Sequence, residues 1–308
     1  MGRAVAWMER WQIPLYLAAI GGAAVVGLAL PAIAEPLTFA INPALGLLLF
    51  ATFLGVPLAS IGAAVRDLRF LGAVLALNFV VVPFIVFGLS RFVAADAALL
   101  VGLLLVLLTP CVDYVIVFTG LAGGARERLL AAAPLLMFGQ ILLLPLYLWL
   151  FAGPVEIEIG PFVEAFLLLI VLPLVAAALT QRWSRFRQGV LTAMVPLMMI
   201  TLAVVVASQI AAVGSRLAAL VVVVPIFVAF LVAMVPVGIG VARIARLDVP
   251  SSRAVVFSGA TRNSLVVLPL ALALPETLAL APLVVVTQTL VELIGMVVYV
   301  RVVPRLVR

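Results

Sequence analysis

The stretch Thr109-Pro110-Cys111-Val112-Asp113-Tyr114 interrupts a long apolar run that extends from Ala97 to Thr119. It holds a proline, the only cysteine of the chain and an acidic side chain. Backbone polar groups inside a bilayer must be satisfied by the protein, so a broken helix at this depth is stable only against protein or a wet cavity. A carboxylate there is costly and commonly belongs to a substrate or ion path. The stretch therefore predicts a discontinuous membrane helix with a functional role.

The composition predicts an integral membrane protein. The chain has 308 residues, of which 67% are hydrophobic and 10% charged, and its mean hydropathy is +1.43. A soluble domain carries about 25% charged residues. The sequence pI of 10.6 comes from arginine alone, and in a membrane protein it indicates topology before nucleic-acid binding.

The residue types that are missing exclude several kinds of chemistry. The chain has no histidine, the commonest metal ligand and the usual proton shuttle, and a single cysteine forms no internal disulfide. No cofactor and no metal site are expected. An intramembrane enzyme that uses Cys111 or Asp113 remains the alternative of a different class, with few catalytic groups at its disposal, so the chain is predicted not to be an enzyme.

Ten apolar runs have the length of about 20 residues that a spanning helix needs. They cover residues 12–33, 41–62, 70–90, 97–119, 129–152, 161–181, 189–212, 217–242, 252–274 and 277–301. The loops between them alternate in arginine content. Only Arg91 and Arg216 lie on the side opposite the termini, and Arg262 lies inside the membrane. The positive-inside rule then places both termini in the cytoplasm. Termini on the same side require an even number of spans, and ten is even.

The second half of the chain repeats the first at an offset of roughly 150 residues. The break at 109–114 matches a second break at 259–264, and Arg66 matches Arg216. Five helices is an odd number, so the two halves are inverted, with repeat 1 at about 12–152 and repeat 2 at about 161–302 of one transporter unit, 1–308. Matched breaks in inverted halves indicate a secondary transporter with its site at the midplane. An ordinary helical bundle with two unrelated breaks is the alternative.

Three charged or reactive side chains lie in or near the breaks. Cys111 is either a small buried hydrophobe or a soft ligand for a thiophilic solute. Asp113 and Arg262 stand at matched positions in the two breaks, and opposite charges at one depth are expected to pair. This pair is either structural, or Asp113 titrates and couples transport to protons.

Glu292 lies near the middle of the last run, with no cation beside it in sequence. It is predicted to carry a proton or contact the substrate; the alternative is a neutral glutamic acid bonded to a neighbouring helix. Further neutral hydrogen-bonding groups are expected at the level of the breaks: Tyr114, Thr261, Asn263 and Ser264. Four amides are interpreted as hydrogen-bond glue between helices: Asn78, Gln140, Gln209 and Gln288.

Together these features resemble the bile acid/sodium symporter superfamily, and within it the arsenical-resistance branch of arsenite efflux permeases. The resemblance rests on Thr-Pro-Cys at 109–111, Arg262-Asn263-Ser264 and Val291-Glu292. It implies discontinuous helices 4 and 9 that cross near mid-membrane, and a panel domain that moves against a core domain. It also implies that Cys111 and Glu292 stand at the places of a functional cysteine and glutamate.

The sequence also departs from that pattern. Arg262 puts a fixed positive charge where sodium-coupled members of the superfamily place acidic and amide groups, and this favours proton coupling. Asp113 is not expected of the arsenite permeases. The sequence predicts a plasma-membrane transporter that exports arsenite, with antimonite as a second candidate, in exchange for protons. Cys111, Tyr114, Asn263 and Ser264 are the expected substrate contacts, and Asp113, Glu292 and Arg262 the coupling residues.

Two alternatives within transport remain open. One is sodium- or proton-coupled transport of an organic anion, with Arg262 binding a carboxylate. The other is a passive channel. The export direction is what the resemblance implies, since inverted repeats are compatible with uptake or export, and the sequence predicts no oligomeric state.

Overall fold

A computed structural model of the chain describes residues 7–8, 11–55, 66–112, 114–153, 167–215 and 217–308. Every element in these ranges is a helix, and the one β contact among them is an isolated bridge between Pro110 and Arg262. The predicted all-α fold is therefore confirmed for the described part of the chain. Two compact units make up the chain: Met1–Gly55 with Ile159–Leu217, named unit 1, and Val56–Glu158 with Ala218–Arg308, named unit 2.

Unit 1 is built around one long helix that packs against two others. Its elements are α2 (Gln12–Ala29), η1 (Pro31–Ile33), α3 (Ala34–Gly55), η5 (Leu167–Val171), α11 (Leu172–Thr180), α12 (Ser184–Thr192) and α13 (Met194–Ser215). Helix α13 packs against α2 and α3. The approach is close: a Cβ on Gly27 of α2 would lie 2.5 Å from the carbonyl oxygen of Ala207 in α13.

The start of α3 corrects a predicted boundary. The sequence predicts a loop before residue 41, whereas α3 begins at Ala34. Pro36 stands in the first turn of the helix, where its missing N–H breaks no intrahelical bond. A proline near the start of an apolar run is therefore compatible with the helix and does not delimit it.

Unit 2 holds both predicted breaks. Its elements are α5 (Leu68–Ala76), η3 (Leu77–Val81), α6 (Val82–Ser90), η4 (Arg91–Val93), α7 (Ala97–Leu107), α8 (Tyr114–Leu121), α9 (Arg126–Ala152), α14 (Leu217–Leu220, which starts at the unit boundary), α15 (Val223–Ile244), α16 (Val249–Ala260), α17 (Ser264–Leu272), η6 (Glu276–Leu278) and α18 (Ala281–Leu306). Helix α16 packs against α15, and α18 packs against α7, α15 and α17.

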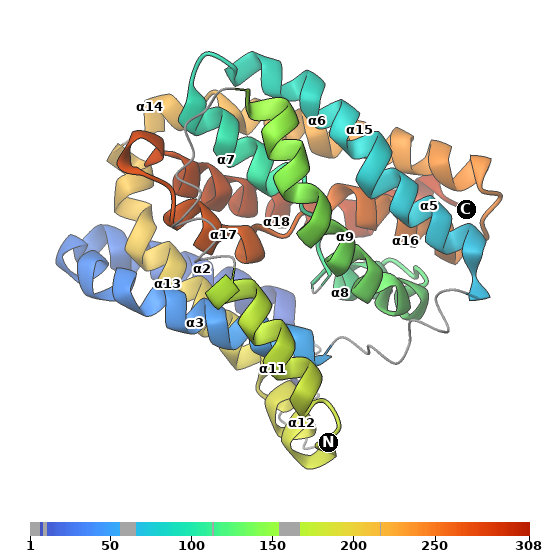
Figure 1. Cartoon of the computed structure of the whole chain (residues 1–308), viewed down its shortest axis with the longest axis horizontal. Helices are drawn as coiled ribbons and strands as arrows, with labels where there is room; N and C mark the ends of the chain where they lie inside the picture. The colour runs from blue at the N-terminus through green and yellow to red at the C-terminus, as the bar shows by residue number, and fades with distance from the viewer. Residues whose placement is uncertain (1–6, 9–10, 56–65, 113, 154–166, 216) are drawn as a thin grey trace. The chain divides into compact units, whose positions relative to one another are not determined.

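A π-helical turn, η3, joins α5 and α6 into one continuous helix (Figure 1). Pro83 follows this turn and has no N–H to donate to the carbonyl of Phe79, four residues earlier. The hydroxyl of Tyr147 in α9 donates to that carbonyl instead, at 2.5 Å. The π turn places Asn78 in the interior of unit 2, where the side chain is fully buried.

Glycines bring the helices of unit 2 into close contact. A Cβ on Gly102 of α7 would lie 2.8 Å from the carbonyl oxygen of Ala281 in α18, and one on Gly238 of α15 would lie 2.8 Å from the Cα of Val256 in α16. The broken helices α7 and α16 are thus held by backbone-to-backbone approach, which only a residue without a side chain allows.

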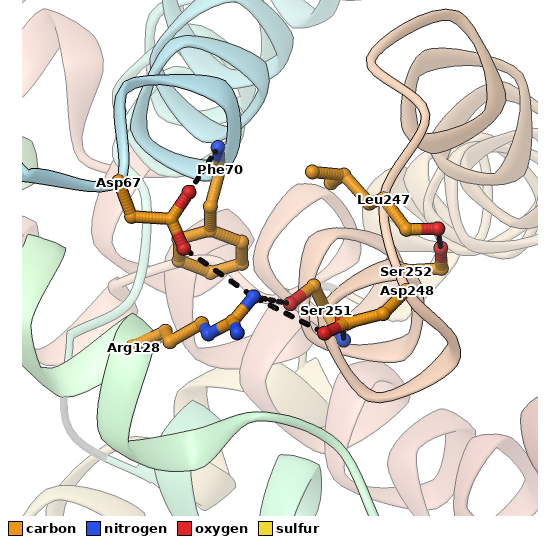
Figure 2. A network of polar contacts seen from close by, with 7 residues as sticks. All are labelled: Asp67, Phe70, Arg128, Leu247, Asp248, Ser251 and Ser252. Atoms are coloured by element: carbon orange, nitrogen blue, oxygen red, sulfur yellow. Dashed lines mark hydrogen bonds and ion pairs between the residues drawn. The ribbon is translucent and has the colours of Figure 1, made fainter.

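An arginine joins the beginnings of two helices at one end of unit 2 (Figure 2). Asp67 accepts from the backbone N–H of Phe70 and caps α5, and Asp248 accepts from that of Ser251 and caps α16. The Arg128 guanidinium lies 3.3 Å from a carboxylate oxygen of each aspartate. It also donates to the hydroxyl of Ser251, at 2.7 Å.

The described residues contain six helices long and apolar enough to cross a membrane. They are Pro36–Gly55, Leu68–Val93, Arg126–Ala152, Met194–Ala211, Ala218–Ile244 and Glu276–Leu306. Each lies at one of the ten predicted runs. The last residues of the predicted run 41–62 (56–62) and the first residues of the predicted run 161–181 (161–166) lie outside the described residues. Length and composition indicate a multi-pass membrane protein.

Candidate transport site

Both predicted helix breaks are present in unit 2. Helix α7 ends at Leu107 and α8 begins at Tyr114, while α16 ends at Ala260 and α17 begins at Ser264. Pro110 accounts for the first break, because proline has no N–H and disfavours helical geometry in the residue before it. Both helices end in the same way: a threonine hydroxyl donates to the carbonyl four residues earlier, from Thr109 and from Thr261.

The two breaks lie against each other as a short antiparallel pair, named the crossing (residues 109–111 and 261–263). Cys111 N–H donates to the carbonyl of Thr261 at 3.1 Å, and Asn263 N–H donates to that of Thr109 at 2.8 Å. Pro110 and Arg262 face each other between these two hydrogen bonds. This is the pair of an antiparallel ladder that exchanges no backbone hydrogen bonds, so the missing N–H of proline leaves no bond unmade there. The two breaks therefore satisfy one backbone N–H and one backbone carbonyl of each other.

The Arg262 guanidinium is bound by oxygens of the broken helices. The side chain is fully buried. Nη1 donates to the carbonyl of Leu107 at 3.3 Å, and Nη2 donates to the carbonyls of Ser258 and Gly259 at 2.7 and 2.6 Å. These carbonyls belong to the last turns of α7 and α16, where no intrahelical N–H reaches them. The ends of two half-helices thus form a binding site for a cation, and the protein's own guanidinium fills it.

Asn78 and an aromatic ring complete the surroundings of the guanidinium. The Asn78 Oδ1 accepts from Nη2 at 2.8 Å, while the Asn78 amide donates to the Ser258 hydroxyl at 2.9 Å. The guanidinium carbon lies 5.6 Å from the ring centroid of Phe230. Sequence reasoning assigned Asn78 to helix–helix hydrogen bonding and missed that it binds Arg262. The available signal is an amide in the apolar run 70–90, five residues before Pro83.

Glu292 lies next to the crossing but is bound through the backbone of Arg262. Its Oε2 accepts from the Arg262 N–H at 2.9 Å and from the Gln288 side chain. Its Oε1 accepts from the Tyr114 hydroxyl at 2.7 Å, and that hydroxyl also lies 2.8 Å from the carbonyl of Arg262. Glu292 is 1% exposed. Tyr114, Arg262 and Glu292, three predicted site residues, are thus in contact.

The expected ion pair between Asp113 and Arg262 lies outside the described residues, because Asp113 does. Within the described ranges, no carboxylate oxygen lies within 4 Å of the Arg262 guanidinium. Carbonyl dipoles and the Asn78 amide stabilise its charge instead. Across the crossing, Arg262 faces Pro110.

Several buried polar atoms around the crossing have no partner among the described residues: Asn263 Nδ2, Ser264 Oγ, Gln288 Oε1 and Arg262 Nε. The Oδ1 of Asn263 accepts from the Val266 N–H at 3.3 Å and so begins α17. Cys111 is fully buried, and its backbone N–H binds the carbonyl of Thr261, two residues before Asn263. Unpaired buried polar atoms cost about 1–3 kcal/mol each, so a site rich in them favours a bound polar solute.

Residues 42–220, more than half of the chain, match the profile of the sodium bile acid symporter family. The match covers the first break, with Cys111 and Tyr114, and ends before the second. No curated protein matches the chain.

Proposed function

The chain belongs to the sodium bile acid symporter family, a family of transporters, and from this premise we propose that it exports arsenite in exchange for protons. The proposal places ten spans in the plasma membrane, with both termini in the cytoplasm and the two units forming one transporter. The observation that carries it is the buried Arg262 guanidinium among the carbonyls of the two broken helices.

An inverted repeat is supported by the symmetry of the crossing. The caps Asp96 and Asp248 and the helix-ending threonines Thr109 and Thr261 stand 152 residues apart in each case. At this offset Pro110 is the counterpart of Arg262, and the two backbone bonds of the crossing are equivalents of each other. This separation of 152 residues gives a more exact value for the predicted offset of roughly 150.

The division into units agrees with two inverted halves. Unit 1 contains the predicted runs 12–33, 161–181 and 189–212 and residues 41–55 of the run 41–62, which are the first two runs of each half. Unit 2 takes the last three of each half, including both breaks. Such an arrangement follows when one half is rotated onto the other and the corresponding helices associate.

The position of the guanidinium argues against sodium at the crossing. Helix C-termini carry partial negative charge, and half-helix C-termini with unwound carbonyls coordinate Na⁺ in secondary transporters. At this crossing the carbonyls of Leu107 and Gly259, which are 152 residues apart, both accept from Arg262. A sodium ion at this place would displace or be repelled by a permanent charge. Sodium-independent transport follows from this arrangement.

The other face of the crossing suits an uncharged, thiophilic solute. Side chains alternate in an extended pair, so we expect Cys111 and Asn263 to project opposite to Pro110 and Arg262. Trivalent arsenic hydroxide is neutral, binds thiols and offers hydroxyls to the unpartnered atoms of Asn263 and Ser264. A single thiol gives a contact that the solute can leave, as transport requires.

Glu292 is the proposed proton carrier, together with Asp113. A hydroxyl has one hydrogen, and Tyr114 lies within hydrogen-bond distance of both Glu292 and the Arg262 carbonyl. When Glu292 is ionised, Tyr114 donates to it. When Glu292 is protonated, its own O–H donates to the Tyr114 oxygen, and Tyr114 donates to the carbonyl. The crossing thus accommodates both protonation states without rearrangement of the backbone.

The runner-up function, organic-anion transport with Arg262 binding a carboxylate, is less well supported. Both Nη atoms already donate to oxygens of unit 2, and the side chain is fully buried. A carboxylate would have to replace carbonyls that have no other donor.

Arsenite tolerance of a sensitive host tests the proposal. Cells that express the wild-type chain should tolerate more arsenite than cells with Cys111→Ser or Cys111→Ala at equal membrane abundance. Full tolerance in both variants would remove the thiol from the mechanism, and competition of transport by organic acids would favour the runner-up.

A further inference from the structure

Gln140 is a buried amide that nothing in the described structure satisfies. It lies in the middle of α9, is 2% exposed, and neither its Nε2 nor its Oε1 has a partner among the described residues. Asn78 and Gln288, by contrast, have hydrogen-bond partners in the Arg262 and Glu292 network. The sequence-based interpretation of Gln140 as hydrogen-bond glue between helices is therefore wrong for this residue.

The position of Gln140 is related to that of Glu292. The two residues are 152 apart, the same separation that relates Thr109 to Thr261 and Pro110 to Arg262. Glu292 belongs to the last helix of the second half and Gln140 to the last helix of the first. If the halves are inverted copies, a two-fold axis through the crossing places Gln140 on the flank opposite Glu292.

The groups that bind Glu292 have no equivalents around Gln140. Glu292 accepts from the Arg262 N–H, the Tyr114 hydroxyl and the Gln288 amide. At the equivalent positions stand Pro110, which has no N–H, and the apolar Val266 and Leu136. All three donors are thus absent, and this explains why the Gln140 amide is unpartnered.

An unpartnered amide at this depth costs about 1–3 kcal/mol, whereas leucine in its place would cost little. A bound ligand is the physical reason to keep the amide. We propose that Gln140 binds the transported solute and that this solute is an uncharged polyhydroxy compound. The amide offers one kind of donor and one acceptor in a fixed, uncharged group, so it matches hydroxyls that both donate and accept. This assignment rests on the inverted halves of the proposed function.

Gln140 and Glu292 would then have separate tasks on the two flanks of the crossing. Glu292 changes its charge during the cycle, and Gln140 gives a contact that does not depend on protonation. In such a site a change in the protonation of Glu292 alone is enough to release the solute, while the hydrogen-bonding capacity of Gln140 stays the same.

Cysteine accessibility tests the location without reference to any substrate. Cys111→Ser removes the only cysteine, so Gln140→Cys in this background presents a single thiol. A hydrophilic methanethiosulfonate should modify it at least tenfold faster than Met137→Cys, whose native residue is fully buried one turn away on α9. Equal or absent modification at both positions would overturn the proposal.

A second variant separates a solute contact from a structural role. In the cysteine-containing chain, Gln140→Leu should leave the melting temperature unchanged or raised and increase the KM for arsenite about tenfold. The control Gln209→Leu, the same change in unit 1, should leave the KM unchanged. A lowered melting temperature of Gln140→Leu with unchanged KM would show that Gln140 is structural. If the wild type does not transport arsenite, the proposed substrate is wrong, and the labelling rates still decide the role of Gln140.

Discussion

Arg262 acts in two ways through two parts of the residue. Its guanidinium is bound to carbonyls of α7 and α16, whereas its backbone N–H binds Glu292. The guanidinium and Glu292 are therefore both linked to the crossing through Arg262, and they form no ion pair in the described structure. In the proposed mechanism, a change of charge on Glu292 reaches the backbone of the crossing through the Arg262 N–H, while the guanidinium holds that backbone between the two helix ends.

Removal of the guanidinium should create a requirement for an external cation. Arg262→Met leaves the carbonyls of Leu107, Ser258 and Gly259 without these donors, and each buried acceptor left unsatisfied costs about 1–3 kcal/mol. We expect a lower melting temperature for this variant, and partial recovery in sodium chloride relative to choline chloride. The wild type should melt at the same temperature in both salts. Sodium-dependent stabilisation of the wild type would contradict the assignment of the guanidinium as the internal cation.

Glu292→Gln should abolish the dependence of transport on the proton gradient while the protein still folds. The amide keeps one oxygen that accepts hydrogen bonds and cannot lose or gain a proton. Tyr114→Phe is the matched control, because it removes one hydrogen bond of about 1.5–3 kcal/mol to the same carboxylate. Its flux should be lower and still gradient-dependent. Proton-driven flux in Glu292→Gln at the wild-type rate would exclude Glu292 as the carrier.

At the residue scale, the sequence identifies the unusual groups but not their partners. Arg262 and Glu292 are evident because charges are rare in apolar runs. The oxygens that bind Arg262 are mostly backbone carbonyls, which every residue has, and Asn78 lies 184 positions away. Gln140 was misassigned because a sequence shows that an amide is buried and does not show whether a donor faces it.

The elements of unit 2 depend on close approach of α7 and α18. Gly102→Ala should destabilise the protein by about 1–3 kcal/mol, since the added Cβ would lie 2.8 Å from the Ala281 carbonyl oxygen. Gly72→Ala in α5 is the control, because nothing lies within 4 Å of its added Cβ. That variant should be neutral or slightly stabilised, as alanine favours helix. Thermal unfolding of both variants measures the difference, and equal melting temperatures would show that α7 and α18 are not in close contact.

The start of α16 should respond to acid. The hydrogen bonds from Ser251 and the charge of Arg128 lower the pKa of Asp248 below its ordinary value of 3.8. A lowered pKa in the folded state means that the stabilisation is present above about pH 4 and is lost as the pH falls through the folded value. Asp248→Asn keeps a capping oxygen but not the charge.

The effect on stability should be small, because the side chains of Asp248 and Arg128 are both partly exposed. Asp248→Asn should lower the free energy of unfolding by about 1 kcal/mol or less at pH 7, and the difference from wild type should shrink as the pH falls below about 4, through the lowered pKa of Asp248. A difference that stays constant between these pH values would show that the charge of Asp248 does not stabilise the fold.

At the element scale, the breaks were predictable and some boundaries were not. Pro110 marks the first break because proline cannot continue a helix. The second break has no proline and was found only through its match with the first. The π turn at 77–81 has no sequence signal beyond Pro83, and the early start of α3 was missed because Glu35-Pro36 is also typical of a loop.

At the scale of the whole molecule, the membrane class follows from composition alone. The assignment of helices to two interleaved units does not, because all the apolar runs resemble one another in composition. It depends on contacts between segments far apart in the chain, as between α3 and α13 or between α7 and α18.

The central claim is that the crossing moves an uncharged thiophilic solute against protons. Arsenite uptake into inside-out membrane vesicles tests it most directly, with and without an imposed proton gradient and in the absence of sodium. The account predicts gradient-driven uptake by the wild type that is lost in Cys111→Ser. Absence of arsenite uptake by wild-type protein of verified abundance, or uptake that requires sodium, would contradict it.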